Sequence, residues 1–260
     1  MGRVRDYREI AQRLHALPKR EWRVEQVGRV WGYPFYRVRR QIDPRAPTIL
    51  VTAGIHGEEP GSVEGALRWM EGGEWAKWRV NWLVLPCINP YGWERNQRRN
   101  AQRRDINRQF RNPAVCPEAQ LVTRLVKGRR FLLVVDLHED VDSPGYYLYE
   151  LRQEPPFLGE RIVAAVGKVI PINRHRVIDG NRATGLGLIR REGNLSRLRR
   201  RLRWPMAYHL FLNGSEHIVG SETPVQLPLP KRARAHNVAL RTAVSALGET
   251  SSRFQAGTVS

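Results

Sequence analysis

The stretch VTAGIHGEEPGSVEGAL, residues 51–67, runs from an apolar segment through a glycine turn into a helix-like segment. Between the two it places His56, Glu58 and Glu59, in a chain that has only 25 acidic residues. Polar side chains after a strand are ordinary loop material. A histidine and a carboxylate with the spacing His-x-x-Glu can also reach one metal ion from a short turn. The rest of the sequence distinguishes these two possibilities.

Short apolar runs recur along the chain and predict a sheet. PTILVTA at 47–53 is a continuous apolar run, typical of a strand buried on both faces. Similar strands are expected at 80–88, 131–137 and 216–221. Helices are expected at 5–17, 62–70, 117–127, 157–169 and 231–246, and a hairpin broken at Gly32 over 22–42. Strands that alternate with helices predict a single α/β domain, a mixed central sheet flanked by helices.

Composition restricts the class of protein. Hydrophobic residues make up 41% of 260 residues, which indicates a globular chain of residues 1–248 with a frayed polar tail over 249–260. No apolar run approaches the roughly 20 residues that cross a bilayer, and the charged start lacks a signal peptide's apolar core, so we expect no membrane contact and a cytoplasmic protein. Cys87 and Cys116 are too far apart in sequence to suggest a disulfide framework or a cysteine zinc site.

The net charge of +19 raises the possibility of nucleic-acid binding. Lysine supplies only five of the 44 basic residues, and the arginines are spread along the whole chain. A dispersed basic surface predicts weak, nonspecific and salt-sensitive binding at most. The arginines of IRREGNLSRLRRRLRW, residues 189–204, are interpreted mainly as a solvated helix face, with a place in a substrate pocket as the alternative.

Polar residues stand at the ends of the predicted strands. His56 with Glu59, His138 and Glu222 each follow one strand, and the turn INPYG follows another. Sites in open α/β sheets form outside the carboxyl ends of the strands, so we expect these groups to converge. Two histidines and a glutamate would leave a fourth position of a zinc ion open for water. Glu58 is the rival carboxylate, and we expect it at the rim.

The segment NPYGWERNQRRNAQRRDINRQF, residues 89–110, makes the pattern specific. Together with GIHGEE, DLHED and SETP, it resembles the zinc carboxypeptidase family of the carboxypeptidase A type, in a compact bacterial-type form. That family has His-x-x-Glu, an Asn-Pro-x-Gly turn, Arg-x-Asn followed by Asp-x-Asn-Arg, a third histidine and a late glutamate. All of these occur here in the same order, over roughly residues 45–245. The resemblance implies a carboxypeptidase-like fold.

The resemblance also implies a metal site. His56, Glu59 and His138 would bind one Zn²⁺ per chain, and Asp105 would hold the first ligand histidine from behind. Glu222 matches the general base that takes a proton from water and delivers it to the leaving amine.

Further residues match the family's substrate contacts. Asn107 and Arg108 correspond to the pair that holds the terminal carboxylate of the substrate. Arg98 corresponds to the arginine that stabilises the oxyanion, with Arg99 as the off-by-one rival. Tyr208 is the candidate for the tyrosine above the substrate. Glu139 and Asp140, which follow His138, are expected to lie around the metal site and not to bind the metal.

The function implied is that of a zinc-dependent metallocarboxypeptidase, which hydrolyses the C-terminal amide bond of peptides. A near branch of the fold, with aspartoacylase and succinylglutamate desuccinylase, hydrolyses N-acyl amino acids and shares the same ligand motifs. SETP followed by a C-terminal helix favours the peptidase. A third alternative, a basic nucleic-acid-binding protein on this fold, would be expected to lose a ligand or the base, and neither is lost here.

Overall fold

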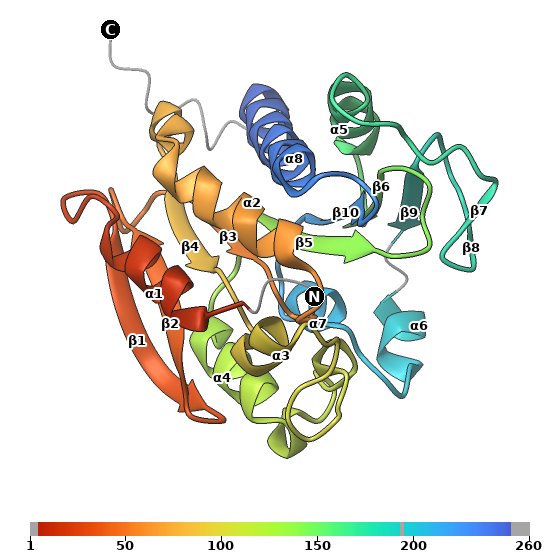
Figure 1. Cartoon of the computed structure of the whole chain (residues 1–260). Coiled ribbons are helices and arrows are strands. Elements are labelled where there is room, and N and C mark those ends of the chain that lie inside the picture. Colours follow the sequence, from red (N-terminus) through yellow and green to blue (C-terminus); the bar gives the residue numbers. More distant parts are fainter. Residues whose placement is uncertain (1–4, 193–194, 251–260) are drawn as a thin grey trace, which may run out of the picture.

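The computed structural model describes residues 5–192 and 195–250, and its centre is an eight-stranded mixed sheet (Figure 1). Neighbouring strands β4, β3, β5 and β10 are parallel, and the antiparallel hairpin β1–β2 and strand β6 flank them. In order across the sheet the strands are β1 (Arg23–Val30), β2 (Tyr33–Arg40), β4 (Asn81–Leu85), β3 (Thr48–Thr52), β5 (Leu133–Asp140), β10 (Ile218–Pro224), β6 (Tyr147–Arg152) and β9 (Leu188–Glu192).

Helices cover both faces of this sheet, as Figure 1 shows. One layer contains α1 (Tyr7–His15), α2 (Pro60–Glu71), α5 (Gly159–Val166) and α8 (Leu229–Thr250). The other contains α4 (Pro117–Val126) and α7 (Met206–Leu212). The short helix α3 (Pro90–Arg95) lies beside α1, where Trp93 contacts Tyr7. The remaining short elements are the 3-10 helices η1 (Glu74–Lys77), η2 (Ile106–Arg108) and η3 (Pro113–Val115), helix α6 (Leu195–Arg200) and the small hairpin of β7 (Val177–Ile178) and β8 (Asn181–Arg182).

Alternation along the central strands divides the core in two. Ile49 and Val51 of β3 belong to the apolar cluster under α1, α2, α5 and α8, whereas Leu50 belongs to the cluster under α4 and α7. This is the period-two pattern of a strand that is buried on both faces. In β5, Val134 and every second residue after it therefore point to the α4/α7 face. Leu137 and its neighbours two positions away point to the α2/α8 face.

The predicted α/β domain with a mixed sheet is confirmed. The hairpin turns at Trp31 and Gly32, whose φ angles of 52° and 86° lie in the left-handed region that glycine adopts without strain. Sequence analysis missed β6, β9 and α7, which are short or carry many polar residues. Helix α8 ends at Thr250, inside the predicted tail, and residues 251–260 lie outside the described residues.

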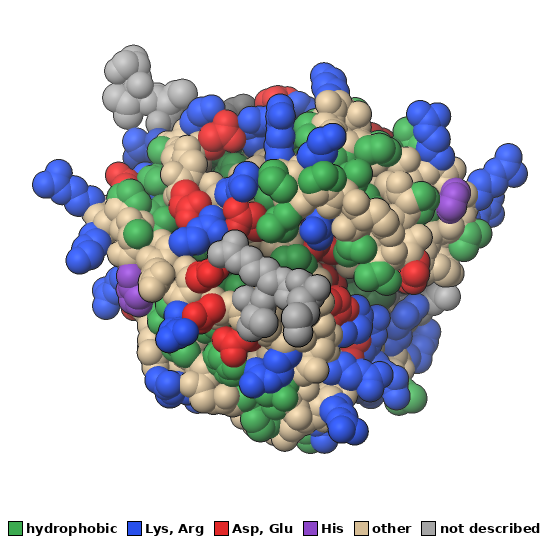
Figure 2. All heavy atoms as spheres, in the orientation of Figure 1, with side chains coloured by type: hydrophobic (Ala, Val, Ile, Leu, Met, Phe, Trp, Pro, Cys, Tyr) green, Lys and Arg blue, Asp and Glu red, His purple; other side chains and the backbone are tan. Residues whose placement is uncertain are grey.

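Cys87 and Cys116 are both buried free thiols. In the part of the chain that the structure describes, no helix has the length and apolar character needed to cross a bilayer. Figure 2 shows Lys and Arg side chains scattered over the visible face, as their spread along the sequence suggests.

Candidate active site

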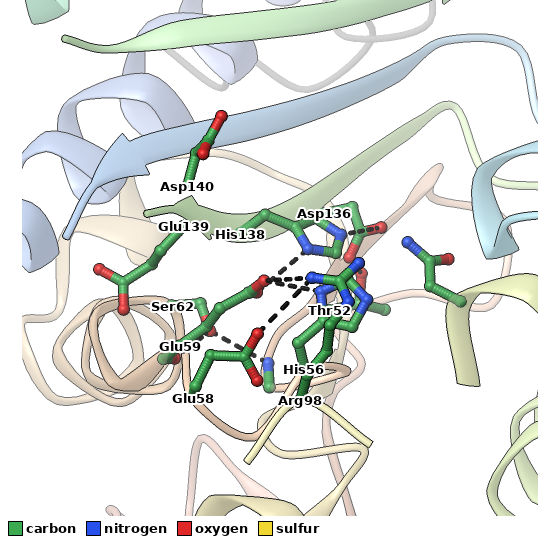
Figure 3. A network of polar contacts seen from close by, with 12 residues as sticks. Thr52, His56, Glu58, Glu59, Ser62, Arg98, Asp136, His138, Glu139 and Asp140 are labelled. Atoms are coloured by element: carbon green, nitrogen blue, oxygen red, sulfur yellow. Dashed lines mark hydrogen bonds and ion pairs between the residues drawn. The ribbon is translucent and has the colours of Figure 1, made fainter. Parts of the chain in front are cut away.

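His56, Glu59 and His138 form a buried cluster at the carboxyl ends of β3 and β5. Their side chains are 3%, 2% and 4% exposed, and one potential ligand atom from each lies within 4.8 Å of the others. The carboxylate of Glu59 points at both rings, with Oε1 2.6 Å from Nδ1 of His56 and Oε2 3.1 Å from Nδ1 of His138 (Figure 3). The structure therefore brings together the three residues that the sequence proposed as ligands.

Glycines shape the loop that carries His56 and Glu59. A Cβ atom at Gly57 would lie 2.0 Å from the carbonyl carbon of Gly92, so only glycine allows the loop to approach helix α3 this closely. The guanidinium of Arg5 donates a hydrogen bond of 2.8 Å to the Gly57 oxygen and ties the loop further. Gly57, the second glycine of the motif GIHGEE, is thus required for packing.

Each histidine of the cluster is held from behind by an aspartate. Nε2 of His56 lies 3.2 Å from Oδ1 of Asp105, and Nε2 of His138 lies 2.9 Å from Oδ2 of Asp136. Such carboxylates fix the tautomer and the ring orientation of a metal-binding histidine. In both residues they leave Nδ1 as the atom that faces the centre of the cluster.

Asp105 has the place that the resemblance implies, whereas Asp136 was missed by sequence analysis. A signal was present in DLHED, because residues i and i+2 of a strand share a face and Asp136 precedes His138 by two. The hydroxyl of Thr52 on the neighbouring strand donates to Asp136 Oδ1 over 2.7 Å and completes this support.

The charges of the cluster suit a cation. Burial opposes protonation of His138, but the nearby charges of Asp136 and Glu59 raise its pKa well above the ordinary value. Burial likewise disfavours the charged form of Glu59, yet the two histidines lower the pKa of this carboxyl to about 2. Three carboxylates around two imidazoles favour positive charge at this position, and a His/Glu/His set is a common zinc ligand set.

Glu222 lies next to this cluster. Its partner in the register of the parallel strands β10 and β5 is His138, and its side chain is half-buried. Burial raises the pKa of Glu222 to about 8, with contributions from Glu59 and Asp140, while His138 opposes the shift. A carboxyl with a raised pKa beside a proposed metal site is a candidate acid–base group.

Arg98 reaches over the same cluster. Its Nε and Nη2 atoms each donate to Asp105 Oδ2 over 3.2 Å, and its Nη1 lies 4.0 Å from Glu59 Oε1. Glu58 forms the outer contact, 3.6 Å from the same Nη1, at the rim where we expected it. Arg99, the rival of Arg98, instead lines a neighbouring cleft.

The cleft beside Asp105 has a volume of about 740 Å³ and is strongly basic. We call it the arginine cleft. Arg203, from the arginine-rich segment 189–204, lines this cleft, which agrees with the alternative interpretation that an arginine of the segment lies in a pocket. Residues 193 and 194 of the segment lie outside the described residues. Its arginines are Arg99, Arg103, Arg104, Arg108, Arg111 and Arg203.

The predicted substrate contacts fare differently. Arg108 is exposed and lines the arginine cleft. Asn107 is only 8% exposed, and its Oδ1 accepts a hydrogen bond of 2.8 Å from the Met206 amide at the start of α7. Tyr208 is 6% exposed and packs in the apolar cluster under α4 and α7, next to Arg201. A substrate role of Tyr208 therefore receives no support.

Glu139 does not lie around the metal site as expected. It alternates with His138 along β5, so its side chain points away from that of His138 (Figure 3). On the α2/α8 face Arg232 pairs with it at 2.6 Å. Asp140 returns to the site face and accepts a hydrogen bond of 2.8 Å from the hydroxyl of Tyr147.

Comparison with known proteins identifies the family of the segment that contains the cluster. Residues 45–175 match the model of the succinylglutamate desuccinylase/aspartoacylase catalytic domain. No curated protein sequence matches the chain significantly. Among solved structures, a candidate metallopeptidase from Shewanella amazonensis SB2B is 25% identical, with 93% of this chain and 91% of that chain covered and a TM-score of 0.75.

Two further structures have the same fold at lower identity. Carboxypeptidase A from Helicoverpa armigera is 14% identical, with 96% of this chain and 75% of that chain covered and a TM-score of 0.67. A metallo-carboxypeptidase from Pseudomonas aeruginosa, in complex with (2-guanidinoethylmercapto)succinic acid, is 17% identical, with 94% and 69% covered and a TM-score of 0.64. The chain has the fold of these carboxypeptidases, and it belongs to the succinylglutamate desuccinylase/aspartoacylase family.

Proposed function

We propose that this enzyme is a zinc-dependent metallocarboxypeptidase that hydrolyses the amide bond next to a free C-terminal carboxylate. The observation that carries the proposal is the position of the cluster of His56, Glu59 and His138 directly beside the arginine cleft. Asp105 joins the two, because it contacts His56 and also lines the cleft.

The cluster fits the ion that this function requires. Nδ1 of His56, Nδ1 of His138 and the carboxylate of Glu59 would hold one Zn²⁺, with Asp105 and Asp136 fixing the two rings. When bound, zinc lowers the pKa of water and polarises the scissile carbonyl.

Two protein side chains carry out the proton transfer and the stabilisation of charge. Glu222 accepts the proton of the attacking water and passes it to the leaving nitrogen, which is why its position beside His138 matters. Arg98, held by two hydrogen bonds to Asp105, presents a positive charge to the oxygen that becomes negative.

The arginine cleft supports recognition of a carboxylate. Among the described residues, none of its six arginines forms an ion pair, whereas many arginines elsewhere pair with glutamates, as Arg13 does with Glu64 and Glu71. The one carboxylate in the lining, Asp105, is already engaged by His56 and Arg98. A guanidinium that is not paired with a carboxylate can bind a substrate carboxylate through two parallel hydrogen bonds. Arg108, whose Nη1 donates to the Asn107 oxygen over 2.9 Å, is our candidate for this contact.

A second candidate function is hydrolysis of N-acyl amino acids, and the match of residues 45–175 favours it. Such a substrate also carries a free carboxylate beside the scissile amide. The same cluster and the same cleft would therefore serve both reactions, and the two differ in the size of the acyl portion.

A substrate panel separates the two functions. We would incubate the zinc-loaded enzyme with a short peptide, the same peptide with an amidated C-terminus, N-acetylaspartate and N-succinylglutamate, and measure released amino acid. The proposal expects cleavage of the free peptide and not of the amidated one. Turnover of the acyl amino acids alone would establish the second candidate. If the zinc-loaded enzyme released nothing from any of these substrates, both would be contradicted.

A further inference from the structure

A continuous chain of hydrogen bonds lies under the sheet, on the face opposite the metal cluster. The Tyr146 hydroxyl is 3.1 Å from Ser221 Oγ, which is 3.0 Å from Nδ1 of His236. Nε2 of His236 lies 3.2 Å from Thr223 Oγ1, and the Thr223 hydroxyl donates to Glu139 Oε1 over 3.2 Å. All five side chains are buried, and we call this set the back network.

The back network has one direction of donation that satisfies every member. The single proton of Thr223 goes to Glu139, so Thr223 accepts from Nε2–H of His236. Nδ1 of His236 is then unprotonated and accepts from Ser221, whose oxygen accepts from Tyr146. This order requires a neutral imidazole, and burial does lower the pKa of His236 to about 3.

Glu139 ends the chain and joins it to two helices. Its Oε1 accepts a hydrogen bond of 2.6 Å from Nη1 of Arg232 in α8, and its Oε2 accepts one of 2.6 Å from the Gly61 amide at the start of α2. A Cβ at residue 61 would lie 2.2 Å from Glu139 Oε1, so the contact depends on glycine at that position. The three hydrogen bonds that this carboxylate accepts thus come from three different elements, β10, α8 and α2.

The residues of β5, α2 and β10 that take part in these hydrogen bonds lie within two positions of a residue of the candidate site. Glu139 follows His138, and Gly61 comes two residues after Glu59. Ser221 and Thr223 stand on either side of Glu222 in β10. Successive side chains of a strand point to opposite faces of the sheet. The back network therefore contacts β5 and β10 on one face, and the residues of the candidate site lie on the other face of the same strands.

We infer that His236 and Arg232 are positioning residues, which through the back network fix Glu222, His138 and Glu59 relative to one another. The inference rests on the proposed function. Catalytic groups have to be held to within about 0.5 Å, and a fully satisfied buried network is rigid enough to do this. Fold stability alone does not require the network, because replacing hydrogen-bonded partners together by apolar groups of the same shape can be nearly neutral.

The test compares three variants with the parent enzyme. Thr223→Val keeps the shape of the side chain and removes the hydroxyl that links His236 to Glu139. Thr223→Ser keeps the hydroxyl and is the conservative rescue. Asn237→Ala is the matched control, because Asn237 also lies on α8 and donates to α2, at the Gly65 oxygen over 2.7 Å, but lies outside the back network. For each protein we would measure the melting temperature, the zinc Kd by chelator competition, and kcat and KM separately.

For Thr223→Val we expect a zinc Kd about 10- to 100-fold weaker and a fall in kcat of similar size, with KM nearly unchanged, as for other groups that orient metal ligands. Thr223→Ser should recover most of both losses, and Asn237→Ala should lower only the melting temperature. If Thr223→Val lowered the melting temperature while zinc Kd and kcat stayed within about two-fold of the parent, the network would be purely structural and the inference wrong. The zinc measurement needs no substrate. A parent that binds zinc and turns over nothing would contradict the proposed function, and the zinc Kd of Thr223→Val would still decide whether the network positions the ligands.

Discussion

Glu222 and His138 lie opposite each other on the parallel strands β10 and β5. The register places the proposed proton acceptor beside a proposed metal ligand, although the two residues are far apart in the sequence. In the described part of the chain Glu222 does not belong to the cluster of potential ligands, which consists of His56, Glu59 and His138. The two roles can therefore be separated by substitution.

Glu222→Gln should keep the metal and the fold and lose turnover. The amide is nearly isosteric but cannot accept a proton, so we expect kcat to fall about 100- to 10,000-fold or more. Peptide affinity, measured by calorimetry, should remain near that of the parent. Activity within a few-fold of the parent would place the base elsewhere, and Glu139 is excluded from that role because its side chain points to the opposite face of the sheet and pairs with Arg232.

His138→Ala should remove the metal. Purified parent protein should contain close to one zinc per chain by elemental analysis, and His56→Ala or His138→Ala should contain almost none, because a site with two ligands binds zinc weakly. His209→Ala is the control, since His209 packs against Phe110 away from the cluster. Full zinc occupancy in His138→Ala would refute the proposed ligand set.

Asp136→Asn tests the support that sequence analysis missed. The amide can still contact Nε2 of His138 but no longer carries the charge that raises the basicity of the ring, so we expect zinc affinity to fall about 10- to 100-fold. Asp105→Asn should act similarly on His56. An unchanged zinc Kd in Asp136→Asn, measured by chelator competition, would show that this contact does not assist metal binding.

Arg203→Glu tests the arginine cleft. Reversing one charge in the lining should raise KM for peptides that end in Glu or Asp more than for peptides that end in Lys or Arg, since the cleft attracts negative charge. Arg45→Glu, an exposed arginine outside the lining, changes the net charge equally and should leave this ratio unaltered. A parent enzyme with a clear preference for basic C-terminal residues would argue against a role of the cleft in specificity.

The stability of the enzyme should fall in acid partly through His236. Its pKa is about 3 in the folded protein and near 6.5 when exposed. Between these values the unfolded state binds the extra proton, so this histidine reduces stability progressively as the pH falls from about 6.5 toward 3, by up to about 1.4 kcal/mol per pH unit. Denaturant unfolding of the parent and of His236→Asn at several pH values should show a shallower decline for the variant. Parallel declines would contradict the assigned shift.

The sequence alone determined the architecture and the principal residues of the candidate site. Apolar runs of strand length between helical segments predicted the α/β domain, because burial on both faces leaves a local signal. Motif spacing identified His56, Glu59 and His138, since polar residues at strand ends meet at one edge of a sheet.

Only the tertiary structure decided which face each side chain serves and what lies behind it. Glu139 follows His138 directly yet points to the other side of the sheet, and Arg203 reaches the arginine cleft from a remote segment. The link from Thr223 to His236 depends on how helix α8 packs on β10. Local sequence constrains the conformation of neighbouring residues, whereas such contacts join segments whose separation in space is fixed only when the whole core packs.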